Sequence, residues 1–189
     1  MPAPPGELPA TELREGELRL RPPRRDEAAL YARWWSDPET RWGFCSSPRT
    51  AAEIAGALPE LEAEARDAGF WTELVLEVDG RPAGSLWISR WDLDAGTAEL
   101  NILIGEPDLR RHGIGRRAVR LFAAWAFRTM GLARLDLCPR DDHLPAIRSY
   151  RAAGAHPNGT CEEVSEWEGQ PVCFARLSFY AADFAAGAG

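Results

Sequence analysis

Hydrophobic and polar residues alternate along several short stretches of the chain, and this period of two predicts strands. In the clearest case Leu100, Ile102 and Ile104 share one face, while Glu99 and Leu103 lie on the other. Similar stretches cover 18–21, 71–78, 84–91, 134–138, 160–167 and 172–180. Asp79-Gly80 predicts a type I′ turn between the second and third strands, and Glu168-Gly169 a closing hairpin.

Apolar residues at helical spacing, bounded by capping residues, predict four main helices. They run from Asp26 to Trp35, from the capping box at Thr50 to Gly69, over 113–130 and over 144–153. The order of elements predicts an α/β fold. Its mixed central sheet has six to seven strands, with an antiparallel front half and a strand–helix–strand–helix back half. Residues 1–16 are expected to be a disordered Pro/Glu-rich tail, 17–180 one folding unit and 181–189 a flexible tail.

Composition removes several classes of function. The 189 residues carry a net charge of −7, which argues against a general nucleic-acid binder. The longest apolar run, 121–127, is far too short to span a membrane, and the start does not resemble a signal peptide. Four cysteines without C-x-x-C spacing indicate reduced thiols in a cytoplasmic protein. His112 and His156 lack ligand spacing, so no metal site is expected.

The segment from Ile104 to Gly115, I-G-E-P-D-L-R-R-H-G-I-G, carries the strongest chemical signal. A strand ends, a loop turns and a helix begins at Gly-x-Gly, which directs unpaired backbone N–H groups at an anion such as phosphate. The segment lacks the Lys of a Walker A loop and the third Gly of a dinucleotide fingerprint. A solvated arginine-rich helix start is the alternative that this segment alone leaves open.

A second segment, L-P-A-I-R-S-Y-R-A-A-G-A at 144–155, follows one helix and one strand later. Together the two segments resemble the GNAT superfamily of N-acetyltransferases. The loop matches the R/Q-x-x-G-x-G/A pattern at Arg110, Gly113 and Gly115, and the second segment matches at Ala146, Ile147, Tyr150 and Gly154. Within the superfamily the chain is similar to ribosomal-protein N-terminal acetyltransferases and to aminoglycoside 6′-N-acetyltransferases, and the motifs do not separate these branches.

The resemblance implies that acetyl-CoA lies between two splayed strands and that an amine attacks its thioester directly. The pantetheine arm would pair with the backbone of Leu103 and Gly105, the loop from Arg111 to Arg116 would hold the pyrophosphate, and Tyr150 would protonate the leaving thiolate. The full set of expected cofactor contacts is Leu103, Ile104, Gly105, Arg110, Arg111, His112, Gly113, Ile114, Gly115, Arg116, His143 and Tyr150. A homodimer is compatible with the resemblance, because dimers are common in similar proteins.

Several positions depart from the family pattern. Arg111 replaces a common Gly, His143 replaces a frequent Asn, and Cys138 lies where several relatives carry an acidic base. Glu99 and Asp136 are the alternative bases, with Glu99 preferred, and a water relay is a further option. Cys138 as an acyl-carrying nucleophile is disfavoured, because no His lies at motif distance and a buried strand thiol is usually inert.

The acceptor is an amine whose class the sequence indicates only weakly. The resemblance implies that Trp35 and Trp42 wall its pocket, because this region walls the acceptor site in relatives and aromatic walls suit organic cations. A stripe of core residues is the alternative for these tryptophans, and Asp136 is expected to border the pocket. The acidic run at 162–168 is interpreted as a solvated edge strand; if it borders the pocket, it favours a polycationic acceptor.

Three functions therefore follow from the sequence. An N-acetyltransferase acting on a small cationic molecule, such as an aminoglycoside or polyamine, is the first, and a protein α-amine is the rival acceptor. A coenzyme A-binding module without turnover is the second class, which the Cys138 and His143 replacements keep open. A nucleic-acid binder needs a wider basic face than one loop and ranks last.

Overall fold

A computed structural model describes residues 11–166 and 168–185 of the chain. One mixed sheet of eight strands runs in the order β1-β2-β3-β4-β5-β6-β8-β7. Only the β5–β6 pair is parallel, which confirms an antiparallel front half and a crossover in the back half. The strands are β1 (Leu13–Glu15), β2 (Leu18–Arg21), β3 (Glu73–Val78), β4 (Arg81–Asp92), β5 (Thr97–Ile104), β6 (Arg134–Leu137), β7 (His156–Val164) and β8 (Pro171–Tyr180).

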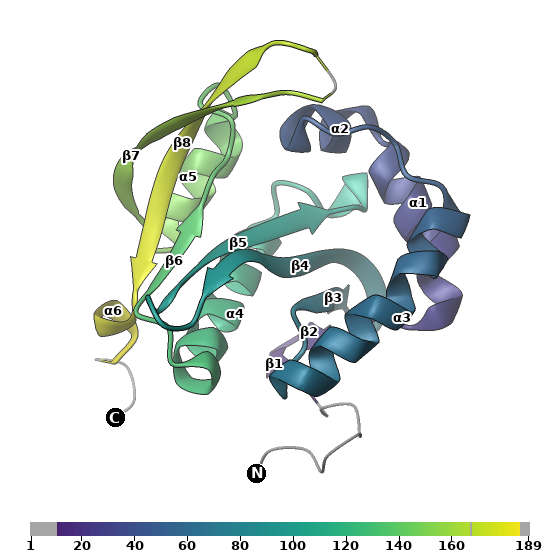
Figure 1. Ribbon diagram of the computed structural model, residues 1–189, viewed down its shortest axis with the longest axis horizontal. Helices are drawn as coiled ribbons and strands as arrows, with labels where there is room; N and C mark the ends of the chain where they lie inside the picture. The colour runs from purple at the N-terminus through teal and green to yellow at the C-terminus, as the bar shows by residue number, and fades with distance from the viewer. Residues whose placement is uncertain (1–10, 167, 186–189) are drawn as a thin grey trace.

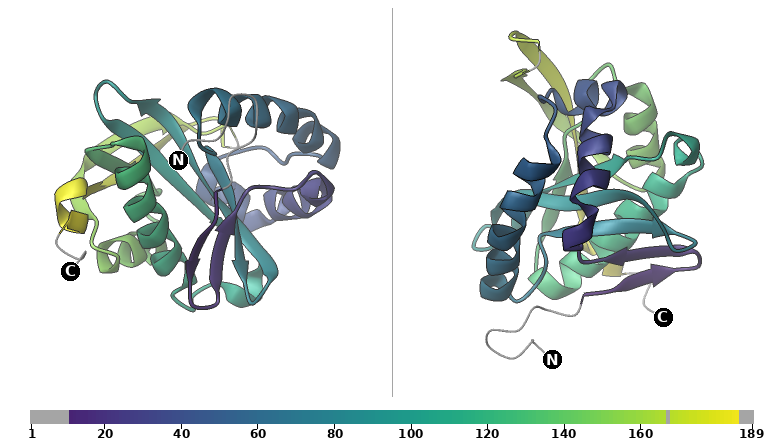
Figure 2. Two further views of the ribbon diagram at one scale, coloured as in Figure 1. Left: turned by 90° about the horizontal axis from the view of Figure 1, so that it is seen from below. Right: turned by 90° about the vertical axis from the view of Figure 1, so that its right-hand side faces the viewer.

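Two groups of helices cover the two faces of this sheet, as Figures 1 and 2 show. The first group packs Tyr31 and Trp34 against Val75 and Leu103, and the second packs Phe122 and its neighbours on the opposite face. The first group comprises α1 (Ala28–Ser36), α2 (Pro38–Phe44) and α3 (Ala51–Ala68), and the second α4 (Ile114–Met130) and α5 (Leu144–Ala152). The α/β class and the predicted faces of β5 are thus confirmed.

The predicted boundaries were wrong at both ends of the folding unit. Strand β1 lies inside the expected tail and pairs antiparallel with β2, because Arg117 of α4 holds Glu15 and Glu17 on the β1–β2 hairpin. At the other end α6 (Ala181–Ala185) continues the chain beyond β8. Its Phe184 packs against Phe127 and Phe179, so this segment is docked where a free tail was expected. Residues 1–10 and 186–189 of the two predicted tails lie outside the described residues.

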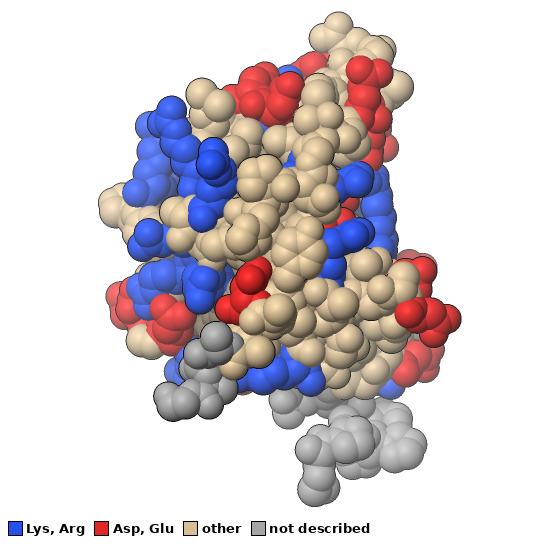
Figure 3. Space-filling view, turned by 90° about the vertical axis from the view of Figure 1, so that its left-hand side faces the viewer, with Lys and Arg blue, Asp and Glu red and all other residues tan. Residues whose placement is uncertain are grey.

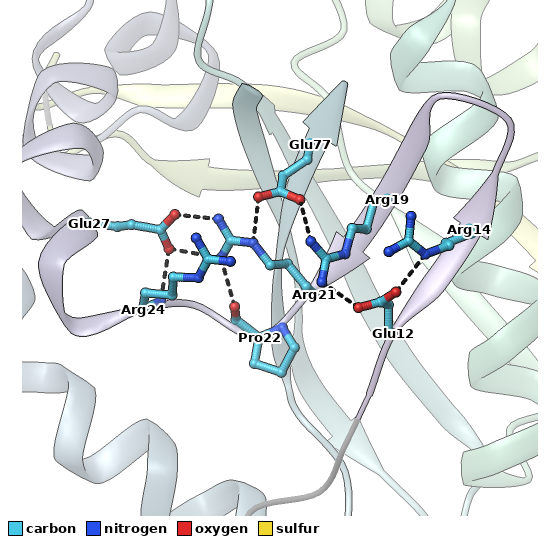
Figure 4. Close-up of polar contacts among 8 residues, drawn as sticks. All are labelled: Glu12, Arg14, Arg19, Arg21, Pro22, Arg24, Glu27 and Glu77. Atoms are coloured by element: carbon cyan, nitrogen blue, oxygen red, sulfur yellow. Dashed lines mark hydrogen bonds and ion pairs between the residues drawn. The ribbon is translucent and has the colours of Figure 1, made fainter. Parts of the chain in front are cut away.

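A network of ion pairs beneath the β1–β2 hairpin fixes the first strands (Figure 4). Alternation in β2 would place Arg21 in solvent, yet its side chain is 3% exposed. Its guanidinium donates to Glu27 and, at 2.6 Å, to Glu77, and Arg19 joins Glu77 at 3.1 Å. Since a buried guanidinium is tolerated only when its donors are satisfied, these two carboxylates are what permit Arg21 to be buried.

Helix α2 was not predicted, because Asp37-Pro38 is usually a helix terminator. Here the same pair starts a new helix: the Asp37 side chain accepts from the Thr40 N–H at 3.0 Å, and Pro38 occupies the first turn. The seven-residue helix places Gly43 and Phe44 opposite the end of β5. This missed element therefore forms one wall of the site described next.

Candidate functional site

Strands β5 and β6 separate after three residue pairs. Thr97, Ala98 and Glu99 pair with residues 134–136, whereas β5 continues to Ile104 without a partner on that edge. Figure 1 shows the two strands diverging toward α2 and the tip of the β7–β8 hairpin. Two connected clefts occupy this opening. The predicted splay is therefore present in the fold.

The backbone at the end of β5 is shifted by one residue from the expected pairing. The Gly105 N–H donates to the Ala83 carbonyl at 2.8 Å, so it faces β4. By the alternation of an antiparallel ladder, the peptide groups of Leu103 also face β4, and those of Ile102 face the open edge. Leu103 and Gly105 thus do not present the expected backbone donors to a cofactor arm, and Ile102 is the residue that sequence reasoning missed.

The first cleft ends at the N-terminus of α4. Gly113 precedes this 17-residue helix with φ of 78°, and no side chain caps the first turn. The N–H groups of Ile114, Gly115 and Arg116 are therefore directed outward without an intrahelical partner. Gly113, Gly115, Ile104 and Leu103 all line the cleft. This arrangement fits an anion such as a diphosphate, with the helix dipole adding to the attraction.

The arginines around this turn divide into two kinds. Arg110 donates to Asp37 at 2.9 Å, to Glu39 at 2.8 Å and to the Ile104 carbonyl at 2.9 Å, so its charge is already balanced. Within residues 11–166 and 168–185, no ion pair involves Arg111 or Arg116, and both are exposed. The free positive charge beside the helix start therefore comes from these two arginines.

His112 and Arg111 differ in how they meet the cleft. The His112 ring donates from Nδ1 to the Arg110 carbonyl, 2.8 Å away, on an exposed turn, and it is not among the residues that line the cleft. Arg111 does line it and has φ of 65°, a left-handed conformation that costs a non-glycine residue about 1–2 kcal/mol. This explains physically why Gly is the usual residue there.

His143 connects the two clefts and begins α5. Its Nδ1 accepts from the Ala146 N–H at 3.1 Å, and its ring stacks on Trp42 with centroids 5.1 Å apart. Because Nδ1 accepts, the neutral ring carries its proton on Nε2, which is then a donor. The imidazole thus supplies the helix cap and keeps one N–H for a ligand.

Tyr150 lines both clefts, on the face of α5 that packs against the core. Burial raises the pKa of its phenol, and the neighbouring Cys138 adds to that effect. The phenol is therefore a protonated donor throughout the neutral range. Its position at the junction agrees with the role expected from the resemblance.

The second cleft has an acidic lining with one cation in it. Arg90 pairs with Glu163 at 2.7 Å and with Glu99 at 3.4 Å, and Glu166 also lines this cleft. Arg90 sits at a bulge of β4 with φ of 48°, which turns its side chain toward Glu99. The acidic run begins on the exposed edge strand β7, as expected, and Glu163 and Glu166 also border the site, which is the alternative that the sequence left open.

Cys138 faces Glu99 across the second cleft. Burial raises the pKa of its thiol to about 12, and the charge of Glu99 contributes to the shift. The thiol thus stays protonated at neutral pH and is neither a base nor a ready nucleophile. Of the two proposed bases, Glu99 lines the cleft, whereas Asp136 accepts from Ser178 Oγ at 2.6 Å and lies outside the lining.

The two tryptophans that were predicted to wall the acceptor pocket lie elsewhere in the structure. Trp42 lies behind His143, with the Arg140 guanidinium 4.7 Å from its ring centroid. Trp35 packs against Phe44 and Trp87 and lines a separate cavity on the α1–α3 side. Neither indole lines the two clefts, so Trp35, Trp42 and Asp136 do not form the acceptor pocket. Phe44, on the unpredicted α2, is an aromatic residue that lines both clefts, as Tyr150 does.

Positive and negative side chains are also separated on the surface of the molecule. Figure 3 shows arginines gathered on the side of this face where α4 and α5 lie, while acidic side chains gather near the end of the β7–β8 hairpin. In the part of the chain that the structure describes, no cluster of His, Cys, Asp and Glu could hold a metal. No helix in these same residues has the length and apolar character needed to cross a membrane.

Comparison with known proteins agrees with this geometry. Residues 17–156 match the family model described as an acetyltransferase (GNAT) domain. An N-acetyltransferase 9-like protein of Caenorhabditis elegans is 33% identical over 58 residues, 31% of this chain and 29% of the relative. The chain therefore matches less than a third of that relative's length.

Solved structures share the whole fold at low sequence identity. A ribosomal-protein-S5-alanine acetyltransferase from Vibrio fischeri has a TM-score of 0.77 at 15% identity, with 92% of this chain and 98% of that one covered. An aminoglycoside acetyltransferase AAC(6')-Ib in complex with coenzyme A has a TM-score of 0.72 at 17% identity, covering 91% and 99%. Given the domain match over most of its length, the chain belongs to the GNAT acetyltransferase family.

Proposed function

We propose that this chain transfers an acetyl group from acetyl-CoA to a primary amine of a small cationic molecule. The observation that carries the proposal is the meeting of two clefts of opposite character at Tyr150. One cleft ends at an uncapped helix N-terminus with free arginines, and the other is lined by carboxylates. An anionic donor and a cationic acceptor are thereby drawn to opposite sides of one phenol.

The first cleft suits the acetyl-CoA side of the reaction. The outward N–H groups at the start of α4 would hold the pyrophosphate, with Arg111 and Arg116 adding charge. The open edge of β5 at Ile102 offers backbone groups to the pantetheine arm, and His143 Nε2 offers one more donor. These contacts orient the thioester toward the second cleft.

Transfer from an ammonium group removes two protons from nitrogen and delivers one to sulfur: one proton leaves through Glu99 to solvent, and the other replaces, directly or through water, the proton that Tyr150 gives to sulfur. Glu99 faces the second cleft and would take the proton of the ammonium group, directly or through water. The free amine attacks the thioester carbonyl, forming the C–N bond. As the C–S bond breaks, Tyr150 gives its proton to the departing thiolate. Its raised pKa keeps that proton available at neutral pH.

The charge of the second cleft supports a cationic acceptor. Glu99, Glu163 and Glu166 line it, and Arg90 offsets only part of their charge. An incoming ammonium group would replace the Arg90 guanidinium as the partner of Glu99. A small molecule with two or more amines satisfies these carboxylates better than a single protein α-amine does.

The test is acetyl-CoA-dependent thiol release with aminoglycosides, polyamines, free amino acids and short peptides as acceptors. We expect turnover with the small cations, loss of it in Tyr150→Phe, and a higher KM for the acceptor in Glu99→Gln. Arg90→Gly, which removes the competing cation, is expected to lower that KM.

Turnover with peptides alone would refute the small-molecule assignment and favour a protein α-amine. Tight acetyl-CoA binding with no thiol release from any acceptor would instead favour a binding module without turnover. Loss of acetyl-CoA binding itself would overturn the assignment of the first cleft.

A further inference from the structure

A third cavity, of about 610 Å³, lies between α1, α3 and the strands β3 and β4. Of the described residues that line it, none lines either cleft of the candidate site. Its volume falls within the ~300–1,000 Å³ range of small-molecule sites. It is therefore large enough for a ligand of its own.

Three polar groups gather at one wall of this cavity: the Glu73 carboxyl, which lines it, and the buried hydroxyls of Tyr31 and Ser85. Tyr31 and Ser85 are 7% and 1% exposed, and both hydroxyls lie beside the Glu73 carboxyl. Both hydroxyls are placed to donate to that carboxyl, and in the described part of the chain no ion pair joins Glu73 to a cation. The carboxyl thus has neutral hydroxyls as neighbours and lacks a cationic partner.

Burial has a measurable consequence for the carboxyl. It raises the pKa of Glu73, and hydrogen bonds from Tyr31 and Ser85, with a smaller effect from the charge of Arg49, oppose this shift only in part. A positively charged donor placed beside Glu73 would remove this penalty. A neutral donor would remove less of it, and an anionic group would increase it.

Aromatic and aliphatic side chains form the remaining walls. Trp35 and Trp87 lie with ring centroids 5.8 Å apart, and Tyr31, Ile54 and Leu58 complete an apolar enclosure. Aromatic faces attract cations, and such walls also suit an apolar body. The cavity thus combines a desolvated carboxylate with surfaces that favour an organic cation.

The charged side chains at the mouth of this cavity do not favour an anionic ligand over a cationic one. Arg24, Arg25 and Arg49 line the mouth beside Glu60 and Glu64, and all five are exposed. Charges of both signs, screened by water, nearly cancel there. Selection by charge is therefore left to the carboxyl inside.

We propose that this cavity is a binding site for a small organic ammonium compound with an apolar body. The ammonium group donates to Glu73 and to the oxygen of Tyr31, and the body lies against Trp35 and Trp87. The site is separate from the clefts of the acetyl-transfer reaction, so it does not depend on the function proposed above.

Isothermal titration calorimetry of the full chain with phenethylamine tests the proposal. Phenethyl alcohol and 3-phenylpropionate are the neutral and anionic probes of similar shape. We expect phenethylamine to bind with one site per chain, the alcohol to bind at least roughly tenfold more weakly, and the acid not to bind. Binding should persist in saturating acetyl-CoA.

Variants locate the site. Glu73→Gln keeps the size of the side chain and should weaken phenethylamine binding at least roughly tenfold, with Tyr31→Phe weakening it less. Glu60→Gln on the rim is the matched control, and Glu99→Gln reports binding in the acceptor cleft; both should bind as the unmodified chain does. A melting temperature for each variant verifies folding.

Three results would overturn the proposal. They are the absence of phenethylamine binding, equal affinity in Glu73→Gln, and loss of binding in Glu99→Gln with Glu73→Gln unaffected. The last result would show that phenethylamine binds in the second cleft of the candidate site.

Discussion

Arg111 offers a substitution whose effects on stability and on cofactor binding should have opposite signs. Its left-handed backbone, φ of 65°, is strained for any residue with a Cβ. Its side chain is exposed, lines the first cleft and makes no ion pair within the described residues. Nothing in the folded chain compensates the strain, so we expect Arg111→Gly to stabilise the protein and to weaken acetyl-CoA binding.

Both magnitudes can be worked from this geometry. Relief of the left-handed conformation should raise the free energy of unfolding by about 1–2 kcal/mol. The greater conformational freedom of Gly in the unfolded chain should lower it by about 0.5–1 kcal/mol. The net gain of about 0–1.5 kcal/mol corresponds to a rise in melting temperature of up to roughly 6 °C for a chain of this size. Loss of one charge-assisted contact to a phosphate should raise the Kd for acetyl-CoA about tenfold.

Differential scanning fluorimetry without ligand and calorimetric titration with acetyl-CoA measure the two effects separately. Arg111→Lys keeps the charge and the strain, so it should melt as the unmodified chain does and bind acetyl-CoA more tightly than Arg111→Gly. If Arg111→Gly binds acetyl-CoA with unchanged affinity, Arg111 makes no phosphate contact. If it melts at a lower temperature, the strain argument fails.

Three further predictions concern the phenol, the thiol and the buried network. Tyr150→Phe should lower kcat about 100-fold or more while leaving the Kd for acetyl-CoA within about threefold; an unchanged kcat in steady-state assays would exclude it as the acid. Cys138→Ala should keep activity. Because the folded pKa of about 12 exceeds the unfolded value near 9, this thiol costs stability as pH rises through that interval, and the variant should lose stability less steeply there; parallel unfolding curves would contradict this. Glu77→Gln, which leaves Arg21 short of one buried partner, should cost about 3 kcal/mol in urea unfolding without altering acetyl-CoA affinity; a loss under 1 kcal/mol would show that Glu27 alone suffices.

Local patterns predicted the elements that depend on local rules. The period of two in 97–104 gave the correct faces of β5, and the capping box at Thr50 gave the start of α3. The Gly-x-Gly after β5 correctly marked the start of α4. These features depend on a few adjacent residues, so the sequence is sufficient to find them.

Features set by distant partners were not predictable in the same way. Residues 13–15 pair as β1 because Arg117, about 100 positions later, holds the hairpin. The one-residue shift at Gly105 follows from the register with Ala83, which no local pattern encodes. Trp35 and Trp42 were placed in the acceptor pocket by the resemblance and by residue type, whereas in the structure their rings pack against Phe44 and His143.

The arginines near α4 show most clearly how tertiary partners assign function. Arg110, Arg111, Arg116 and Arg117 are equivalent in the sequence, all within one turn of the same glycines. Carboxylates from α2 and from the β1–β2 hairpin neutralise the first and the last, and these pairs fasten those segments to the loop.

The two middle arginines keep their charge, although the chain as a whole carries −7. Attraction of an anion to the start of α4 therefore depends on which arginines lack an acidic partner more than on how many arginines are present. Salt should consequently weaken acetyl-CoA binding, because it screens about two exposed charges. The affinity should depend less on salt concentration than it would with four unpaired arginines.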